Sequence, residues 1–323
     1  MNRKNFLKTI LGASLFTSID GFASIAHIIS DMNKEQQTSE KFASFGAIHL
    51  NITHLEKSTR FWTEIVGMKL LSTSGNTAEL GTDVNTLVVL HETVKKKFQK
   101  GYSGLYHVAI HAPNIQEFAS MVYRLALNKY PFSPVDHTMS KSVYLDDPDG
   151  INIEFTLETP ERFKRVVTDR GLSIEDVNGN IRSASDRLDL DEVMSHLGSP
   201  NIDKIISNET YIGHLHLYAN NVANSNSFYQ KLGFESFNNL PQFMYADVGA
   251  GGSYKHRIAM NSWHGMNKPM APSDSAGMRH FNIIFNNKEK FDLALNNLTG
   301  VETKDDGYWF LDPTGNKICL TFS

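Results

Sequence analysis

Four segments of the chain alternate apolar and polar residues with the period of a β-strand, and an amphipathic, helix-like stretch follows each of them. A polar residue stands where each helix is expected to begin; these residues are His54, Asn114, Asn221 and Asn287. Asn is a favoured N-cap because its side chain accepts from free helical N–H groups. Short strand-like runs separated by Gly and Pro turns come next. The pattern predicts a β-α-β-β-β unit repeated four times, over residues 44–92, 104–157, 211–265 and 277–323.

The repeats also share sequence landmarks at nearly constant offsets. In the first and third units, His49 and Phe61 recur as His216 and Phe228. In the second and fourth units, a D-P-D-G turn at residues 147–150 recurs as D-P-T-G. His107 on the first strand of the second unit recurs as His280, an offset of 173, whereas the turn recurs at an offset of 165. The fourth unit is therefore eight residues shorter than the second between these two landmarks.

The repeats divide the chain into an N-terminal domain, residues 44–157, and a C-terminal domain, residues 211–323. A connecting segment, residues 158–210, separates them. It contains a predicted short helix at Asp189–Leu197 and a predicted turn at residues 178–180. We expect this segment to link two domains of two repeats each.

The first 30 residues have the features of a targeting signal. A basic start, M-N-R-K-N-F-L-K, precedes an apolar stretch with small residues, which is the order of an export signal. The start resembles a twin-arginine signal in which Lys4 replaces the second arginine, so we expect export to the periplasm. An ordinary amphipathic helix in a cytoplasmic protein is the alternative. Residues 31–43 are polar and predict a linker.

Composition narrows the classes of partner. Lys and Arg number 31 against 35 Asp and Glu, so no basic excess indicates nucleic acid. Asp20 interrupts the apolar stretch of the leader, which argues against a stable membrane span. The single cysteine, Cys319, excludes an internal disulfide and a Cys-rich zinc site. Thirteen His residues make imidazole the expected metal ligand.

Several strings resemble one superfamily. The longest is D-H-T-M-S-K-S-V-Y-L-D-D-P-D-G-I-N-I-E at residues 136–154, and G-L-Y-H-V-A-I at 104–110 and Y-I-G-H-L-H-L at 211–217 extend the match. Over residues 44–323 the chain resembles the vicinal oxygen chelate superfamily of glyoxalases, bleomycin-resistance proteins and extradiol dioxygenases. Within it, the bacterial catechol 2,3-dioxygenase-like proteins are most similar. The resemblance implies an α+β fold in which four βαβββ modules form paired open, U-shaped mixed sheets.

The resemblance also implies where metal ligands stand. In this superfamily one ligand lies on a module's first strand, seven residues before the helix, and another lies on a module's last strand. These positions hold His107 and Glu154 in module two and His214 in module three. We therefore predict a metal site between modules two and three.

The other modules lack a complete set. The matching positions hold Ala47 in module one, and His280 with Cys319 in module four. The remaining histidines singled out in the sequence are interpreted as non-ligands: His49, His54, His91, His111, His216 and His264. Modules one and four are thus expected to form a degenerate, structural pair.

Two His and one carboxylate suit Fe(II), with Mn(II) as the alternative, and leave room for a chelating diol and O₂. By the same resemblance, His256 on a late strand of module three, Tyr254–Trp263, is the acid–base residue. Tyr144 is expected to donate to the substrate oxygen, and His137 is expected to support it. Trp309 stands in module four where Tyr144 stands in module two.

We therefore predict an Fe(II)-dependent extradiol dioxygenase whose partners are a small aromatic diol and O₂, with homo-oligomerisation left open. A dioxygenase that cleaves hydroquinones is a closely related alternative. A glyoxalase-like metal-dependent lyase or isomerase is a second hypothesis, although it needs four protein ligands. A non-enzymatic binder of aromatic compounds, using aromatics such as Tyr144, Trp263 and Phe243, is a third.

Overall fold

The computed structural model describes residues 40–199, 201 and 203–323. The predicted export signal, residues 1–30, and residues 31–39 of the predicted linker lie outside the described residues. Export therefore stays a prediction. Lys41–Ser323 form one compact unit, and the description below concerns this unit.

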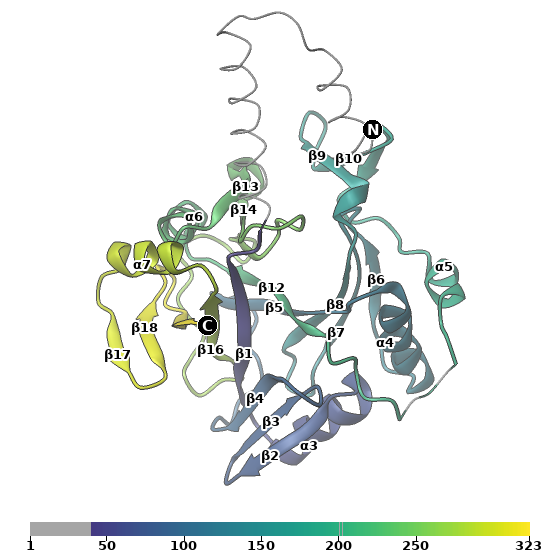
Figure 1. Cartoon of the computed structure of the whole chain (residues 1–323), viewed down its shortest axis with the longest axis horizontal. Coiled ribbons are helices and arrows are strands. Elements are labelled where there is room, and N and C mark those ends of the chain that lie inside the picture. Colours follow the sequence, from purple (N-terminus) through teal and green to yellow (C-terminus); the bar gives the residue numbers. More distant parts are fainter. Residues whose placement is uncertain (1–39, 200, 202) are drawn as a thin grey trace, which may run out of the picture. The chain divides into compact units, whose positions relative to one another are not determined.

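Two eight-stranded mixed sheets dominate the unit (Figure 1). The first sheet has the order β17-β18-β19-β16-β1-β4-β3-β2. Its strands are, in that order, Glu302–Lys304, Gly307–Leu311, Lys317–Phe322, Gly277–Phe285, Ala43–Ile52, Thr86–Glu92, Thr77–Gly81 and Lys69–Ser74. They come from the first and fourth sequence repeats, which meet where β1 pairs antiparallel with β16.

The second sheet has the order β13-β14-β15-β12-β5-β8-β7-β6. Its strands are Glu235–Leu240, Tyr245–Gly249, Ile258–Asn261, Tyr211–Tyr218, Gly104–His111, Asn152–Glu158, Ser140–Asp146 and Ser133–Asp136. They come from the third and second repeats, joined by antiparallel pairing of β12 with β5. The predicted α+β fold and the pairing of module two with module three are confirmed.

Each repeat carries one main helix, and all four begin at the predicted residue. The helices are α3 (Leu55–Arg60, continued by a π-helical turn at Phe61–Val66), α4 (Ile115–Leu127), α6 (Val222–Lys231) and α7 (Lys288–Asn297). The side chains of His54, Asn114, Asn221 and Asn287 accept from the backbone N–H three residues on. These caps satisfy donors that the first helical turn leaves free.

The connecting segment folds into a short helix and a small third sheet. Helix α5 spans Leu190–Ser195 after the N-cap Asp189, close to the predicted bounds. The third sheet has the order β11-β10-β9, with β9 at Phe163–Val167, β10 at Ser173–Asp176 and β11 at Ile181–Ser183. The predicted turn at residues 178–180 joins β10 to β11, and Gly179 there takes a φ of 85° that suits glycine.

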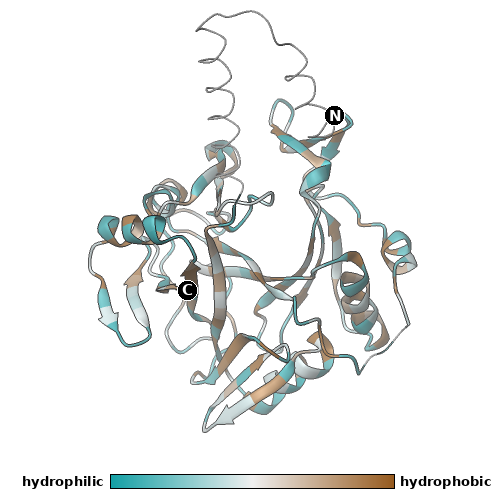
Figure 2. Cartoon of the chain, viewed as in Figure 1, coloured by the Kyte–Doolittle hydropathy of each residue, from teal (hydrophilic) through white to brown (hydrophobic). Residues whose placement is uncertain are grey.

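The hydrophobic core lies around the central strands of both sheets, because β1 contacts β12 and β16 contacts β5. The end of strand β16, residues 283–285, is apolar, whereas α7 is coloured mostly hydrophilic in Figure 2. Helix α4 packs on β8, where Phe118 and Phe155 are fully buried. Burying side chains of this size contributes about 1.5–3 kcal/mol each. This packing holds the central strands of each sheet rigid, so that polar side chains on these strands have fixed positions.

Within the described residues, no helix combines the length and the apolar character needed to cross a bilayer.

Candidate metal centre and active site

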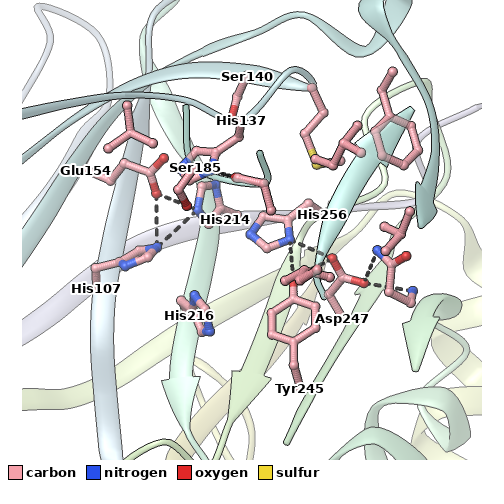
Figure 3. Close-up of a pocket in the computed structure, with 18 of the residues that line it drawn as sticks. His107, His137, Ser140, Glu154, Ser185, His214, His216, Tyr245, Asp247 and His256 are labelled. Carbon is pink, nitrogen blue, oxygen red and sulfur yellow. Dashed lines mark hydrogen bonds and ion pairs between the residues drawn. The ribbon is translucent and has the colours of Figure 1, made fainter. Parts of the chain in front are cut away.

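Three predicted ligands meet on adjacent central strands of the second sheet. His107 lies on β5, Glu154 on β8 and His214 on β12. The Nε2 atoms of His107 and His214 lie 3.0 and 2.9 Å from Oε2 of Glu154, and 3.3 Å from each other (Figure 3). All three side chains are at most 3% exposed. In the part of the chain that the structure describes, they form the one group of three side chains spaced to hold a metal ion.

The spacing of the donor atoms fits one metal ion. Ligands on one face of an octahedral ion, with bonds of about 2.1 Å, have donor atoms roughly 3.0 Å apart. Oε2 of Glu154 is buried and makes no well-directed hydrogen bond among the described residues, despite its two imidazole neighbours. A buried, unsatisfied carboxylate oxygen is costly unless a cation completes its environment. Two imidazoles and one carboxylate are also the donor set typical of non-haem Fe(II) oxygenases.

The charge state of the cluster also suits a divalent cation. Burial lowers the pKa of His214 well below its usual value, so this imidazole is neutral near pH 7. Burial alone would raise the pKa of Glu154, but its interactions with His214 and the close His107 outweigh burial and hold this pKa well below its usual range. The carboxylate is therefore ionised. Metal ligands must be deprotonated to bind, and His214 and Glu154 meet that condition.

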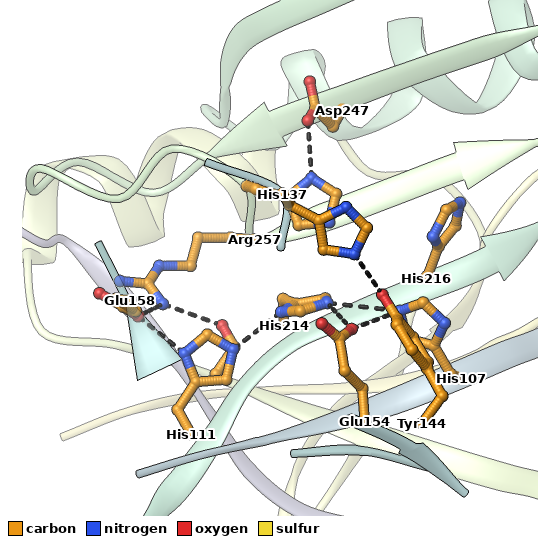
Figure 4. Close-up of polar contacts among 12 residues, drawn as sticks. His107, His111, His137, Tyr144, Glu154, Glu158, His214, His216, Asp247 and Arg257 are labelled. Carbon is orange, nitrogen blue, oxygen red and sulfur yellow. Dashed lines mark hydrogen bonds and ion pairs between the residues drawn. The ribbon is translucent and has the colours of Figure 1, made fainter. Parts of the chain in front are cut away.

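A second imidazole stands behind His214. Nε2 of His111 lies 2.8 Å from Nδ1 of His214, and Nδ1 of His111 lies 2.8 Å from Oε1 of Glu158 (Figure 4). The carboxylate can only accept, so His111 donates from Nδ1 and accepts at Nε2. His214 then donates from Nδ1, which leaves the lone pair of its Nε2 directed at Glu154 and His107. The chain of bonds fixes the tautomer of His214 whose Nε2 is free to hold a metal.

Glu158 is itself held in place. Nη1 of Arg257 donates to its Oε1 at 2.6 Å, and the hydroxyl of Tyr211 donates to the same oxygen at 2.7 Å. Burial would raise the pKa of Glu158, but His111 and Arg257 together lower it. Glu158 is therefore a fixed negative charge behind His111.

Sequence interpretation placed His111 among the non-ligands and did not identify this support. A signal was present: His107 with His111, and Glu154 with Glu158, stand four residues apart on neighbouring strands. In a β-strand, residues at this spacing point to the same face.

The hydroxyl of Tyr144 faces the cluster and contacts His137. Tyr144 pairs with Glu154 across β7 and β8, and its hydroxyl lies 2.8 Å from Nε2 of His137. Nδ1 of His137 lies 2.7 Å from the carbonyl oxygen of Ala184. Since a carbonyl only accepts, His137 donates there, and Tyr144 donates to Nε2. Burial and the charge of Glu154 raise the pKa of Tyr144 well above 10, so the phenol keeps its proton.

His256 reaches the same cavity from a different local structure than expected. The predicted late strand Tyr254–Trp263 is shorter, because β15 covers only Ile258–Asn261. Lys255 and His256 lie in an irregular segment before it, and this part of the strand prediction is wrong. The irregular backbone frees His256 from sheet pairing.

An acidic partner orients His256. Its Nδ1 lies 2.7 Å from Oδ2 of Asp247 and 3.1 Å from the hydroxyl of Tyr245 (Figure 3). Asp247 is 1% exposed, and Asn238 fixes its other oxygen through a backbone and a side-chain bond. Nε2, on the opposite side of the ring, is left to face the cavity. Sequence interpretation missed Asp247, because the partner lies across a strand pair and a loop.

These side chains line one cavity of about 360 Å³. It includes His107, Glu154 and His214 together with His137, Tyr144 and His256. Trp263 also lines it, whereas Phe243 lies outside and accepts a bond from the indole of Trp263 through its carbonyl oxygen. All six predicted site residues therefore share a single chamber.

The equivalent place in the first sheet is filled differently. Trp309 pairs with Cys319 where Tyr144 pairs with Glu154, as the sequence offset predicts. His280 stacks on His49 with 3.8 Å between ring centres and meets Trp309 edge-on. Burial lowers the pKa of His280 to about 3 and that of His49 to about 4. Neutral stacked rings, with Cys319 in the place that the Glu154 carboxylate takes in the second sheet, make this sheet a structural counterpart.

Comparison with known proteins agrees with this architecture. The sequence pattern of the Glyoxalase/Bleomycin resistance protein/Dioxygenase superfamily matches residues 43–155. A catechol-2,3-dioxygenase of Bacillus subtilis (strain 168) is 28% identical over 285 residues, covering 86% of this chain and 96% of that protein.

Two solved structures share the fold at low sequence identity. A candidate dioxygenase from Bacillus subtilis superposes with a TM-score of 0.55 at 12% identity, covering 88% of this chain and 86% of the other. A point mutant of glyoxalase I from Zea mays superposes with a TM-score of 0.51 at 15% identity, covering 87% of this chain and 94% of the other. These likenesses concern the fold alone.

Proposed function

We propose that this protein is an Fe(II)-dependent extradiol dioxygenase, and the match of residues 43–155 to the glyoxalase/bleomycin resistance/dioxygenase superfamily pattern supports the proposal. Its substrates would be a catechol-type aromatic diol and O₂. The observation that carries the proposal is the convergence of His107, Glu154 and His214 at the floor of a cavity that also holds a carboxylate-oriented His256. The catechol-2,3-dioxygenase relative adds support for the chemical class.

The metal would be held by Nε2 of His107, Nε2 of His214 and a carboxylate oxygen of Glu154. Fe(II) is proposed, with Mn(II) as the alternative for the same donors. When bound, the metal would supply Lewis-acid activation of the diol and a site for O₂. The remaining groups of the cavity then act on protons and orientation.

His256 is proposed as the acid–base residue. Its Nδ1–H donates to Asp247, so Nε2 carries the lone pair and can take a proton from one diol hydroxyl. Asp247 stabilises the imidazolium that results, as a buried carboxylate does for other catalytic histidines. The imidazole of His256 then returns the proton when the carbon–carbon bond beside the diol breaks in the aromatic ring of the substrate. Both oxygen atoms of O₂ enter the product.

Tyr144 is proposed to accept a hydrogen bond from a diol hydroxyl rather than to donate one as the sequence led us to expect, because its own proton goes to Nε2 of His137. Tyr144 lies against Glu154 in the strand pairing, and its high pKa keeps the phenol neutral. His137 holds the hydroxyl from the other side, with its own ring fixed by the carbonyl of Ala184. The pair therefore orients the diol while His256 moves the proton.

The test is ring cleavage with ¹⁸O₂. Protein loaded anaerobically with Fe(II) is mixed with catechols and hydroquinones, and the products are weighed by mass spectrometry. The proposal predicts a ring-opened product that carries two ¹⁸O atoms from a catechol. Cleavage of hydroquinones but not of catechols would identify the protein as a hydroquinone dioxygenase instead. Tight diol binding without O₂ uptake in the loaded protein would favour an aromatic-binding protein instead.

A further inference from the structure

The third sheet closes the open side of the catalytic chamber. The connecting segment is tied to β6 at one edge of the second sheet, where Asp186 pairs with Asp136 and Arg162 forms a 2.7 Å ion pair with the same Asp136. It also reaches β13 at the opposite edge, where Phe163 contacts Phe237 with 5.4 Å between ring centres. The segment therefore spans the two edge strands above the floor that carries the metal ligands.

The roof of the cavity is apolar where the floor is polar. The connecting segment contributes Phe163, Val166, Leu172 and Ile174 to the lining, and the edge strands contribute Val135 and Leu240. Val166 and Ile174 are cross-strand partners on β9 and β10. The proposed ligands stand on the central strands β5, β8 and β12. A ring whose diol meets the floor therefore points its far end toward these side chains.

The chamber offers no fixed cation to a charged substituent. None of the described residues that line it is Lys or Arg, and Glu154 and Asp247 both contribute carboxylates. A substituent carboxylate would lose its hydration without gaining a partner, which is costly. Charge therefore disfavours acidic diols, and the apolar roof favours alkyl or aryl groups.

The size of the chamber points the same way. A cavity of roughly 150 Å³ is enough to hold benzene, and this one measures about 360 Å³. An unsubstituted catechol would leave much of the roof uncovered. A substituent of several carbons would bury that apolar surface, and each added methylene is expected to tighten binding about three- to fourfold.

We propose that the substrate is an uncharged catechol bearing an apolar substituent, and that the segment Phe163–Ile174 is its specificity element. This inference rests on the proposed function, because it takes the diol end of the ligand to lie at the metal. It assigns a role to a segment that the catalytic residues alone do not explain.

The test compares two diols that differ only in charge at the end of the chain: 4-butylcatechol and 4-(3,4-dihydroxyphenyl)butanoate. Binding to the Fe(II)-loaded protein is measured by calorimetry without O₂, and kcat/KM is measured with O₂. We expect 4-butylcatechol to bind at least about tenfold more tightly than the acid, with the same preference in kcat/KM.

Two matched variants locate the preference. Val166→Lys places a cation at the roof and is expected to bring the two affinities within about twofold, or to invert them. Val177→Lys makes the same change at a side chain that is 54% exposed and does not line the cavity, and it should keep the preference. Equal binding of both diols by the parent, or equal effects of both variants, would overturn the specificity inference while ring cleavage still stands. Failure of both diols to bind or react would contradict the proposed function itself.

Discussion

Nε2 of His111 lies 2.8 Å from Nδ1 of His214, so the proposed metal ligand is backed by a second imidazole. Gly213 makes this contact sterically feasible. A Cβ at this position would stand 2.1 Å from ring atoms of His111. The ring cannot simply turn away, because Glu158 and His214 hold both of its nitrogens. The glycine before His214 is therefore part of the support of the proposed metal centre.

Gly213→Ala is expected to displace His111 and release the tautomer of His214. Loss of such outer support typically weakens metal binding by about 10–100-fold. The measurement is Fe(II) affinity from a competitive chelator titration under anaerobic conditions. Gly198→Ala is the matched control, because no atom lies within 4 Å of a Cβ built there. Unchanged affinity in a folded Gly213→Ala protein would show that His111 does not position His214.

His256→Gln is expected to lower kcat by about 10²–10⁴-fold, the range for loss of a general base. Fe(II) content should stay at the parent level, because Nδ1 of His256 faces Asp247 and its ring is not among the converging ligands. Steady-state O₂ uptake and metal analysis measure the two effects. His196→Gln, at a 42% exposed side chain of the connecting segment that does not line the cavity, is the control. Metal loss in His256→Gln would assign this residue to the ligand set instead.

Asp147 predicts a pH-dependent difference in stability. It is 4% exposed, and its Oδ1 accepts from the backbone N–H groups of Asp149 and Ile151, while Oδ2 has no hydrogen-bond partner among the described residues. In the fourth repeat, the corresponding oxygen of Asp312 receives bonds from Tyr229 and Asn316. Burial, with the nearby Asp149, raises the pKa of Asp147 to about 7.

The folded protein therefore keeps a proton on Asp147 between about pH 4 and 7 that the unfolded chain releases. The stabilisation this proton provides is complete below pH 4 and is lost as the pH rises through 7. At about 1.4 kcal/mol per pKa unit, the loss is at most about 4 kcal/mol. Asp147→Asn has no such titrating group. The free energy of unfolding of the variant minus that of the parent should therefore be larger at pH 8 than at pH 4.5. Urea denaturation at both pH values measures this, and a difference that does not change with pH would count against the buried charge.

Local and repeated features of the fold were predictable from the sequence. The four caps depend on one side chain and the turn that follows it, and the offset of Trp309 from Cys319 reproduces that of Tyr144 from Glu154. The cluster of His107, Glu154 and His214 was predicted by applying the ligand positions that the resemblance to the vicinal oxygen chelate superfamily implies to each repeat. These features depend on spacing along one strand or helix.

Partners across strands were not predictable in the same way. The bulge at Gly213 shifts the register between β12 and β5, so that His214 pairs with Ala109. Alternation along one strand contains no information on that shift, and His111 was therefore left without a role. Asp247 reaches His256 only because the strand before Ile258 gives way to irregular backbone, where the apolar–polar pattern had predicted a continuous strand.

The most direct test of the account compares His214→Ala with His280→Ala. Both remove an imidazole from a central strand, one in the proposed metal centre and one beside Trp309 in the first sheet. The two proteins and the parent are reconstituted with Fe(II) without O₂, analysed for bound iron, and then supplied with O₂ and 4-butylcatechol or catechol. The account predicts one iron per chain and rapid O₂ uptake in the parent and in His280→Ala, and neither in His214→Ala. Equal iron and equal uptake in His214→Ala and the parent would contradict a metal-dependent site between modules two and three.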